Sequence, residues 1–178
     1  MNLSFKHLTR YIAITGISVL TLSFVLGVAG MRLNVSGSIP LGVYWESKTI
    51  FQKGDYVIFC PPKNSLFDRI KKRGYIGIGF CEGGYGLMMK RVAAIEGDMV
   101  SITREGVHIN GELLLHSELH DKDEQQRLLP QYKISQFTLE NAEILLMGET
   151  STSFDGRYFG PLHASFIQGV IHPVLIWK

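Results

Sequence analysis

The feature that most constrains this chain is an uncharged apolar stretch close to its N-terminus. The run YIAITGISVLTLSFVLGVAGM covers Tyr11 to Met31 without a charged residue. A helix rises about 1.5 Å per residue, so about 20 apolar residues span a hydrocarbon core of roughly 30 Å. The stretch therefore predicts a single transmembrane helix over residues 11–31.

The charges that flank this stretch indicate its orientation. Lys6 and Arg10 lie in the short tail 1–10, and Arg32 follows the stretch. The positive-inside rule then places the tail in the cytoplasm and exports residues 32–178.

Two other interpretations of the stretch compete with an anchor. The first is a cleaved signal peptide, because the small residues Ala29 and Gly30 resemble a cleavage site. An apolar signal core has about 7–15 residues, however, and this run is longer. The second is a buried core helix, which would need partner helices that the rest of the sequence does not indicate. An uncleaved anchor is favoured.

Composition argues against a nucleic-acid-binding protein. Apolar residues make up 46% of the 178 residues, and the anchor accounts for the excess. The net charge is only +2, with Lys and Arg scattered among Asp and Glu, so no basic stripe is present. Beyond the anchor, the length suits one compact domain.

The exported part is expected to be mainly β. Short strand-like runs alternate with turn signals such as Lys53-Gly54-Asp55 and Asn110-Gly111, and helical periodicity is almost absent. Residues 74–86 are rich in glycine and predict a loop or an irregular strand. A polar segment within about 112–136 predicts a variable, partly helical insertion. The strand-like runs are 43–45, 56–59, 87–95, 99–103, 107–110, 143–147 and 169–177.

Ser38 is the first candidate for chemistry. It lies in SGSIP, a few residues after the apolar stretch, where Pro40 fixes its own φ and biases Ile39 toward an extended conformation. Such a stiff turn can hold a hydroxyl and its amide in place. Taken alone, the motif is more typical of an ordinary turn.

Lys90 is the second candidate, in the apolar run LMMKRVAAI. Strand alternation places it on one face with Met88 and Val92, and Met89 with Arg91 on the other. Burial of a lysine lowers its pKa, and a neutral amine can act as a general base toward a serine. The alternative is a lysine at a sheet edge that extends its ammonium group into solvent.

The third candidate motif is SFDGR, with Ser153, Asp155 and Arg157. An Asp–Arg pair two residues apart is usually a surface ion pair of little energetic value. In this sequence it could also fix a turn that carries Ser153 beside Lys90.

In this order, behind an apolar helix, the three motifs resemble the boxes of the bacterial signal peptidase I family. Its serine box S-G-S-M-x-P is similar to SGSIP, its lysine box to KRVAAIEGD, and its late box to GETSTSFDGRYFG. The departures are a shorter spacing from Ser38 to Pro40, Glu-Thr after Gly148, and Gly156 in place of serine. SIPLGVYW, YVIFCPP, RGYIGIGFC, GGYGLMMKRV and TSFDGRYFGP resemble more closely the conjugative-transfer branch, the TraF peptidases.

The resemblance implies a signal-peptidase-I-like antiparallel β domain and a role for each matched residue. Ser38 would be the nucleophile and Lys90 the general base, with Asp155 as the supporting catalytic aspartate. The oxyanion and support residues would be Ser36, Ser153, Arg91 and Arg157. Two cysteines, which by themselves leave a disulfide and free thiols open, would pair outside the membrane: Cys60 and Cys81.

The resemblance also implies a function. The chain would be a single-pass enzyme of the bacterial inner membrane that processes a pilin precursor in the periplasm, beside mating-pair formation proteins. Hydrolysis would give a linear pilin and acyl transfer to an amine would close it into a ring, and the sequence leaves both outcomes open. Tyr44 and Trp45 would lie at the membrane interface or in the core. No cofactor is expected, and the spacing of His116 and His120 does not match a zinc motif.

Three alternatives stay open at this stage. A general signal peptidase would use the same chemistry on export precursors. A non-catalytic periplasmic subunit of a conjugative apparatus would keep the fold, but it would gain nothing from a buried lysine. A self-cleaving repressor shares the dyad but requires a DNA-binding helical module and no membrane span.

Overall fold

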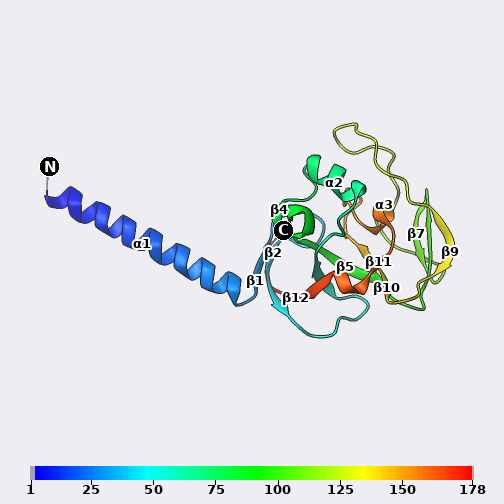
Figure 1. Ribbon diagram of the computed structural model, residues 1–178, viewed down its shortest axis with the longest axis horizontal. Coiled ribbons are helices and arrows are strands. Elements are labelled where there is room, and N and C mark those ends of the chain that lie inside the picture. The colour runs from blue at the N-terminus through cyan, green and yellow to red at the C-terminus, as the bar shows by residue number, and fades with distance from the viewer. Residues whose placement is uncertain (1–2, 178) are drawn as a thin grey trace.

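The structure is a computed structural model that describes residues 3–177. The first two residues of the expected tail 1–10, and Lys178, lie outside the described residues. A long N-terminal helix extends away from a β domain, and the C-terminus lies on the side of the domain from which this helix emerges (Figure 1). The elements are α1 (Leu3–Val28), β1 (Met31–Asn34), β2 (Gly42–Ser47), β3 (Tyr56–Phe59), α2 (Ser65–Lys72), β4 (Ile78–Cys81), η1 (Glu82–Gly84), β5 (Met88–Ala94), β6 (Met99–Thr103), β7 (Gly106–Ile109), β8 (Glu112–Leu113), β9 (Ile134–Thr138), β10 (Glu143–Met147), α3 (Gly156–Phe159), β11 (Leu162–His163), η2 (Ala164–Phe166) and β12 (Ile167–Ile176).

Helix α1 is long and apolar enough to cross a membrane over His7–Val28, with a mean hydropathy of 2.1 and no burial against the domain. It ends three residues before the predicted limit. Gly30 turns the chain with a φ of +112°, a value that favours glycine, and β1 begins at the next residue. Arg32 donates to the carbonyl oxygen of Gly27 at 2.7 Å, which satisfies one of the free carbonyls at the helix C-terminus.

The domain is mainly β, as the sequence predicts, and its strands other than β4 form two antiparallel sheets. The larger sheet has the order β1-β2-β12-β3-β5-β10-β11, and the smaller one the order β8-β7-β6-β9. Residues far apart in the sequence thus become neighbours, since β5 pairs with β3 on one side and β10 on the other. This places the lysine box on β5 directly beside β10, the strand that leads into the late box.

The core is divided between the two sheets. One cluster of buried side chains lies under the larger sheet and includes Phe59, Val92 and Phe154. A second cluster joins the smaller sheet to β10 through Val100, Ile102 and other residues. Tyr44 is fully buried, which makes it a core residue, while Trp45 remains 41% exposed.

Helix α2 is an element that the sequence prediction missed. Asn64 caps it by accepting from the Phe67 amide at 3.0 Å, and Phe67 and Ile70, three residues apart, face the core. The segment that contains α2 is closed by a disulfide between Cys60 and Cys81.

The polar segment within 112–136 contains no helix, which corrects the expectation of a partly helical insertion. It holds β8, the start of β9 and an isolated bridge between Lys122 and Leu128. Its turns depend on side-chain contacts: the Asp123 carboxylate accepts from the amides of Gln125 and Arg127 at 2.9 Å each. Asp and Asn side chains that accept from nearby amides favour turns over helix interiors. This explains why the segment forms turns and not the expected helix.

Candidate active site

Ser38 lies in the loop between β1 and β2, and the backbone of this loop is held in place on both sides. The amide of Glu149 donates to the Ser38 carbonyl oxygen at 2.7 Å. The Thr150 hydroxyl donates to the Gly37 carbonyl oxygen at 3.0 Å. The loop after β10 therefore fixes the serine loop directly.

Lys90 reaches the Ser38 side chain from β5. Its Nζ lies 2.5 Å from Ser38 Oγ and 3.1 Å from Ser153 Oγ, and the two serine oxygens are 3.3 Å apart. Side chains along β5 alternate between buried and more exposed positions, and Lys90 takes a buried one with 2% exposure. Three groups thus meet: a hydroxyl, an amine and a second hydroxyl that orients the amine.

Burial lowers the pKa of the Lys90 amine to about 8. The dominant cause is desolvation, because an ammonium ion loses its hydration inside the domain. The negative charge of Asp155 raises this pKa and the positive charge of Arg157 lowers it, both to a smaller extent. A pKa near 8 leaves part of the lysine neutral at physiological pH, so that its nitrogen can accept a proton.

Asp155 and Arg157 form a fully buried ion pair beside this site. Arg157 Nε lies 2.8 Å from Asp155 Oδ1, and its Nη2 lies 2.9 Å from Oδ2, which gives a two-point contact. The carboxylate also accepts from the Gly148 amide at 2.8 Å. The pair therefore ties α3 to the end of β10, where the loop that supports Ser38 begins.

The remaining donors of Arg157 are satisfied by backbone carbonyls. Nη1 donates to the oxygens of Glu118 and Ser151 at 3.2 and 3.1 Å, and Nη2 also donates to that of Thr150 at 3.2 Å. An arginine has five N–H groups, and all five are used here. Such complete bonding is what a buried charge requires.

Arg91 lies outside this site, which corrects its expected role as a support of Asp155. It is exposed on the face of β5 opposite to Lys90, and its Nε donates to the Gly54 carbonyl oxygen at 3.0 Å. Adjacent residues of a strand point to opposite faces, so Arg91 cannot accompany Lys90 into the interior.

Ser36 is exposed near Ser38 but engages a different partner. Its hydroxyl donates to Asn34 Oδ1 at 2.8 Å. To donate to a substrate oxyanion, this hydroxyl would have to rotate away from Asn34.

Sequence reasoning missed two residues that shape the site. Asn34 is buried under the serine loop. At Gly148, an added Cβ would overlap the Ser153 side chain and lie 3.0 Å from the Ser38 carbonyl oxygen. The presence of a glycine at position 148 was a sequence signal for close packing. Asn34, at the end of a strand, gave no comparable signal.

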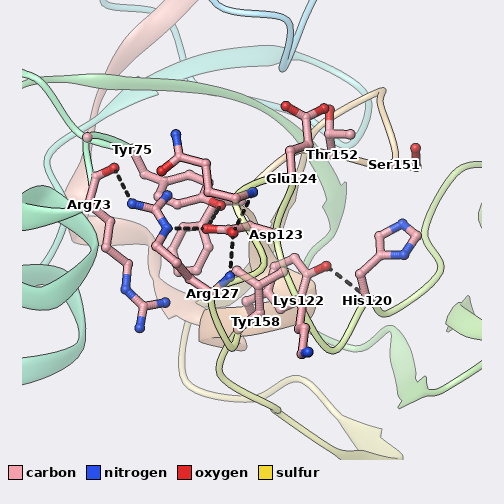
Figure 2. Close-up of a pocket in the computed structure, with 14 residues that line it drawn as sticks. Arg73, Tyr75, His120, Lys122, Asp123, Glu124, Arg127, Ser151, Thr152 and Tyr158 are labelled. Atoms are coloured by element: carbon pink, nitrogen blue, oxygen red, sulfur yellow. Dashed lines mark hydrogen bonds and ion pairs between the residues drawn. The ribbon is translucent and has the colours of Figure 1, made fainter.

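Two cavities adjoin at the site. One, of about 400 Å³, is lined by residues from all three boxes, including Ser38, Lys90 and Ser153. The other, of about 450 Å³, lies over the polar segment and contains the ion pair of Asp123 and Arg127 (Figure 2). The residues that line both cavities are Tyr75, Thr152 and Phe154.

Among residues 3–177, no group of three or more His, Cys, Asp or Glu side chains is placed to hold a metal ion.

Comparison with known proteins gives consistent matches along the chain. Residues 6–177 match the family model described as signal peptidase, peptidase S26. A plasmid transfer protein TraF of Escherichia coli is 52% identical over 97% of this chain and 98% of its own length. A conjugal transfer protein TraF of Agrobacterium tumefaciens (strain 15955) is 33% identical over 95% of this chain and 97% of its own. A solved signal peptidase I of Enterococcus faecalis V583 aligns with 71% of this chain and 100% of its own, at 19% identity and a TM-score of 0.41.

Proposed function

The chain belongs to the signal peptidase family, peptidase S26, and we propose that it is a membrane-anchored serine endopeptidase with Ser38 as nucleophile and Lys90 as general base. The observation that carries this proposal is the 2.5 Å contact between Lys90 Nζ and Ser38 Oγ at a buried lysine. With a pKa of about 8, the amine is neutral often enough to accept the hydroxyl proton.

The proposed reaction is an acyl transfer. Neutral Lys90 takes the proton of Ser38 Oγ, which attacks the carbonyl carbon of the substrate. The Ser38 amide stabilises the resulting oxyanion. The Lys90 ammonium group then gives its proton to the leaving amine as the peptide bond breaks, and an acyl-enzyme remains. Water releases a linear product, whereas attack by the amino terminus of the same peptide closes a ring.

Ser153 and the buried ion pair act indirectly in this scheme. The Ser153 hydroxyl, 3.1 Å from Lys90 Nζ, orients the amine toward Ser38. Asp155 and Arg157 hold the loop after β10, and this loop in turn holds the Ser38 backbone. Fixed geometry of this kind raises the rate because the reacting groups are already aligned.

We assign the substrate to the conjugative system: a pilin precursor at the periplasmic face of the inner membrane. The names of the relatives, plasmid transfer and conjugal transfer protein TraF, support this role. The apolar helix α1 supports an anchor, and the Cys60–Cys81 disulfide supports an exported domain, since disulfides persist in oxidising compartments. A general signal peptidase acting on export precursors is the alternative that the substrate test distinguishes.

The test follows a co-expressed pilin precursor by intact mass in membranes that contain the wild type, Ser38→Ala or Lys90→Ala. The wild type is expected to shorten the precursor, and both variants are expected to leave it intact. A product lighter by one water than the linear processed chain would identify ring closure.

Exposed residues of the same types provide matched controls. Ser135→Ala and Lys133→Ala, both on the surface, are expected to process the precursor at the wild-type rate. Full processing by Lys90→Ala would refute the dyad. Processing of export precursors in place of pilin would keep the chemistry and overturn the substrate assignment.

A further inference from the structure

The Asn34 side chain is the centre of a hydrogen-bond cluster beneath the nucleophile loop. It is the last residue of β1 and only 3% exposed, although asparagine is a polar residue. Its Nδ2 lies within 2.9 Å of the Ser36 carbonyl oxygen and 3.0 Å of those of Ile39 and Pro40. One side-chain amide thus bonds carbonyls on both sides of Ser38.

The other end of the same side chain holds the start of the loop. Asn34 Oδ1 accepts from the Ser36 amide at 3.1 Å and from the Ser36 hydroxyl at 2.8 Å. Asn34 is therefore both donor and acceptor to the loop, and no aliphatic side chain of its size could replace these contacts.

With Asn34 in place, each carbonyl from Ser36 to Pro40 has a donor. Those of Gly37 and Ser38 are bonded by the loop after β10, through the Thr150 hydroxyl and the Glu149 amide. The two N–H groups of Asn34 Nδ2 are shared among the other three, and the Pro40 carbonyl oxygen also accepts from the Tyr44 hydroxyl at 2.7 Å. The orientation of every peptide plane in the loop is thus fixed by a named contact.

This arrangement leaves the Ser38 amide available. A trans peptide points its N–H opposite to its C=O, so the Gly37 carbonyl directed at Thr150 turns the Ser38 N–H the other way. Within residues 3–177, no group accepts a hydrogen bond from this N–H. It is the donor that the proposed mechanism uses for the oxyanion.

We propose that Asn34 is a positioning residue that sets the rate of acylation by holding the Ser36–Pro40 loop with Ser38 Oγ toward Lys90 and the Ser38 N–H toward the substrate oxyanion. This inference rests on the proposed function, because it concerns the same reaction. The hydrogen bonds of the Asn34 side chain go to the loop and to neither Lys90 nor Ser38 Oγ. It acts through the loop backbone.

The experiment compares Asn34→Ala and Asn34→Asp with the wild type in single-turnover processing of the precursor by the full-length protein in membranes. Asn34→Ala is expected to lower the maximal rate about 100-fold, the loss that a displacement of about 1 Å can cause, with KM changed less than about threefold. The pH dependence of the residual rate is expected to keep the wild-type midpoint, since Lys90 and its surroundings are intact.

Asn34→Asp separates the two halves of the side chain. A carboxylate keeps the acceptor for Ser36 but has no donor for the three carbonyls, and its charge repels their oxygens. Under the proposal, this variant is at least as slow as Asn34→Ala. Wild-type rates in Asn34→Asp would overturn the proposal.

Asn64→Ala is the matched control for folding. Asn64 caps α2 through a comparable bond to the Phe67 amide, away from the serine loop. It is expected to lower the thermal midpoint without lowering the maximal rate. If Asn34→Ala loses no more rate than Asn64→Ala at equal stability, the role of Asn34 is only structural and the inference fails. The result that would refute the proposed function is a different one: Ser38→Ala would then process the precursor like the wild type.

Discussion

Two of the Asp–Arg ion pairs within residues 3–177 lie near the two cavities, and they differ in their exposure to solvent. Asp155 and Arg157 are both fully buried, whereas Arg127 in the pair with Asp123 keeps 31% of its side-chain surface exposed. The first pair lies beside Ser153 and the dyad. The second lies in the neighbouring cavity, where Asp123 also accepts from the Tyr75 hydroxyl at 3.0 Å (Figure 2).

The comparison shows that burial determines how strongly each charge of an ion pair depends on its partner. Water reaches the Arg127 side of the Asp123–Arg127 pair, and this pair stabilises a turn of the polar segment. The Asp155–Arg157 pair has no solvent to replace a lost partner, so each charge depends on the other. Its field also reaches Lys90, whose pKa Asp155 raises and Arg157 lowers.

The largest expected effect follows from breaking the buried pair. Arg157→Ala leaves the Asp155 carboxylate buried without its partner and three backbone carbonyls without this donor. We expect the free energy of unfolding to fall by about 3–5 kcal/mol, with loss of processing. Denaturant unfolding of the domain measures this directly. A loss below about 1 kcal/mol would show that the pair is dispensable.

The next effect concerns Lys90, a buried amine whose hydrogen-bond partners are two hydroxyl groups and not a carboxylate. Folding lowers the pKa of Lys90 from 10.5 to about 8, so the folded state disfavours the protonated form. Stability therefore rises with pH between about 8 and 10.5, because the unfolded chain binds more protons there. Lys90→Met removes this cost.

We expect Lys90→Met to raise the free energy of unfolding by about 3 kcal/mol at pH 7, at about 1.4 kcal/mol per pKa unit, and to abolish processing. The gain should disappear above about pH 10. Unfolding curves at pH 7 and pH 10 measure both statements. A variant less stable than the wild type at pH 7 would contradict them.

A smaller effect is expected from crowding the contact between the late loop and the serine loop. In Gly148→Ala the new methyl group overlaps Ser153, so the Ser153 hydroxyl must leave its position 3.1 Å from Lys90 Nζ. We expect a loss of about 1–3 kcal/mol in stability together with a slower reaction. Gly77→Ala, where an added Cβ meets no atom within 4 Å, is the control for stability. Equal rates for Gly148→Ala and the wild type would argue against the role of Ser153.

The smallest effect is expected at the solvated pair. Arg127→Ala should change stability several-fold less than Arg157→Ala, and processing should stay at the wild-type rate. Its contribution should also weaken as salt is added, since exposed charges are screened. A loss of activity as large as that of Arg157→Ala would show that the second cavity takes part in catalysis.

The sequence predicted the β class because it rests on local patterns. Alternation along LMMKRVAAI placed Lys90 on one face with Met88 and Val92 and Arg91 on the other, but it left burial of Lys90 and a position at a sheet edge both open. The expected support from Arg91 came from the family resemblance and disagreed with this pattern. The pattern was the better guide for that residue.

The missed features depend on contacts that exist only in the folded chain. Helix α2 has two turns and two buried apolar residues, too few for a clear period, and its Asn64 cap was the signal that could have revealed it. Asn34 bonds backbone carbonyls of a loop whose shape no short motif encodes. The burial of Asp155 and Arg157 likewise follows from the packing of α3 against β10, and not from their spacing of two residues.

The central claim is that neutral Lys90 activates Ser38, and the pH dependence of single-turnover processing tests it most directly. Protonation removes the base, so the rate is predicted to fall about tenfold per pH unit below a midpoint near 8 and to level above it. A rate that is constant between pH 6 and pH 9, or a midpoint near 10.5 as for a solvated lysine, would contradict the account.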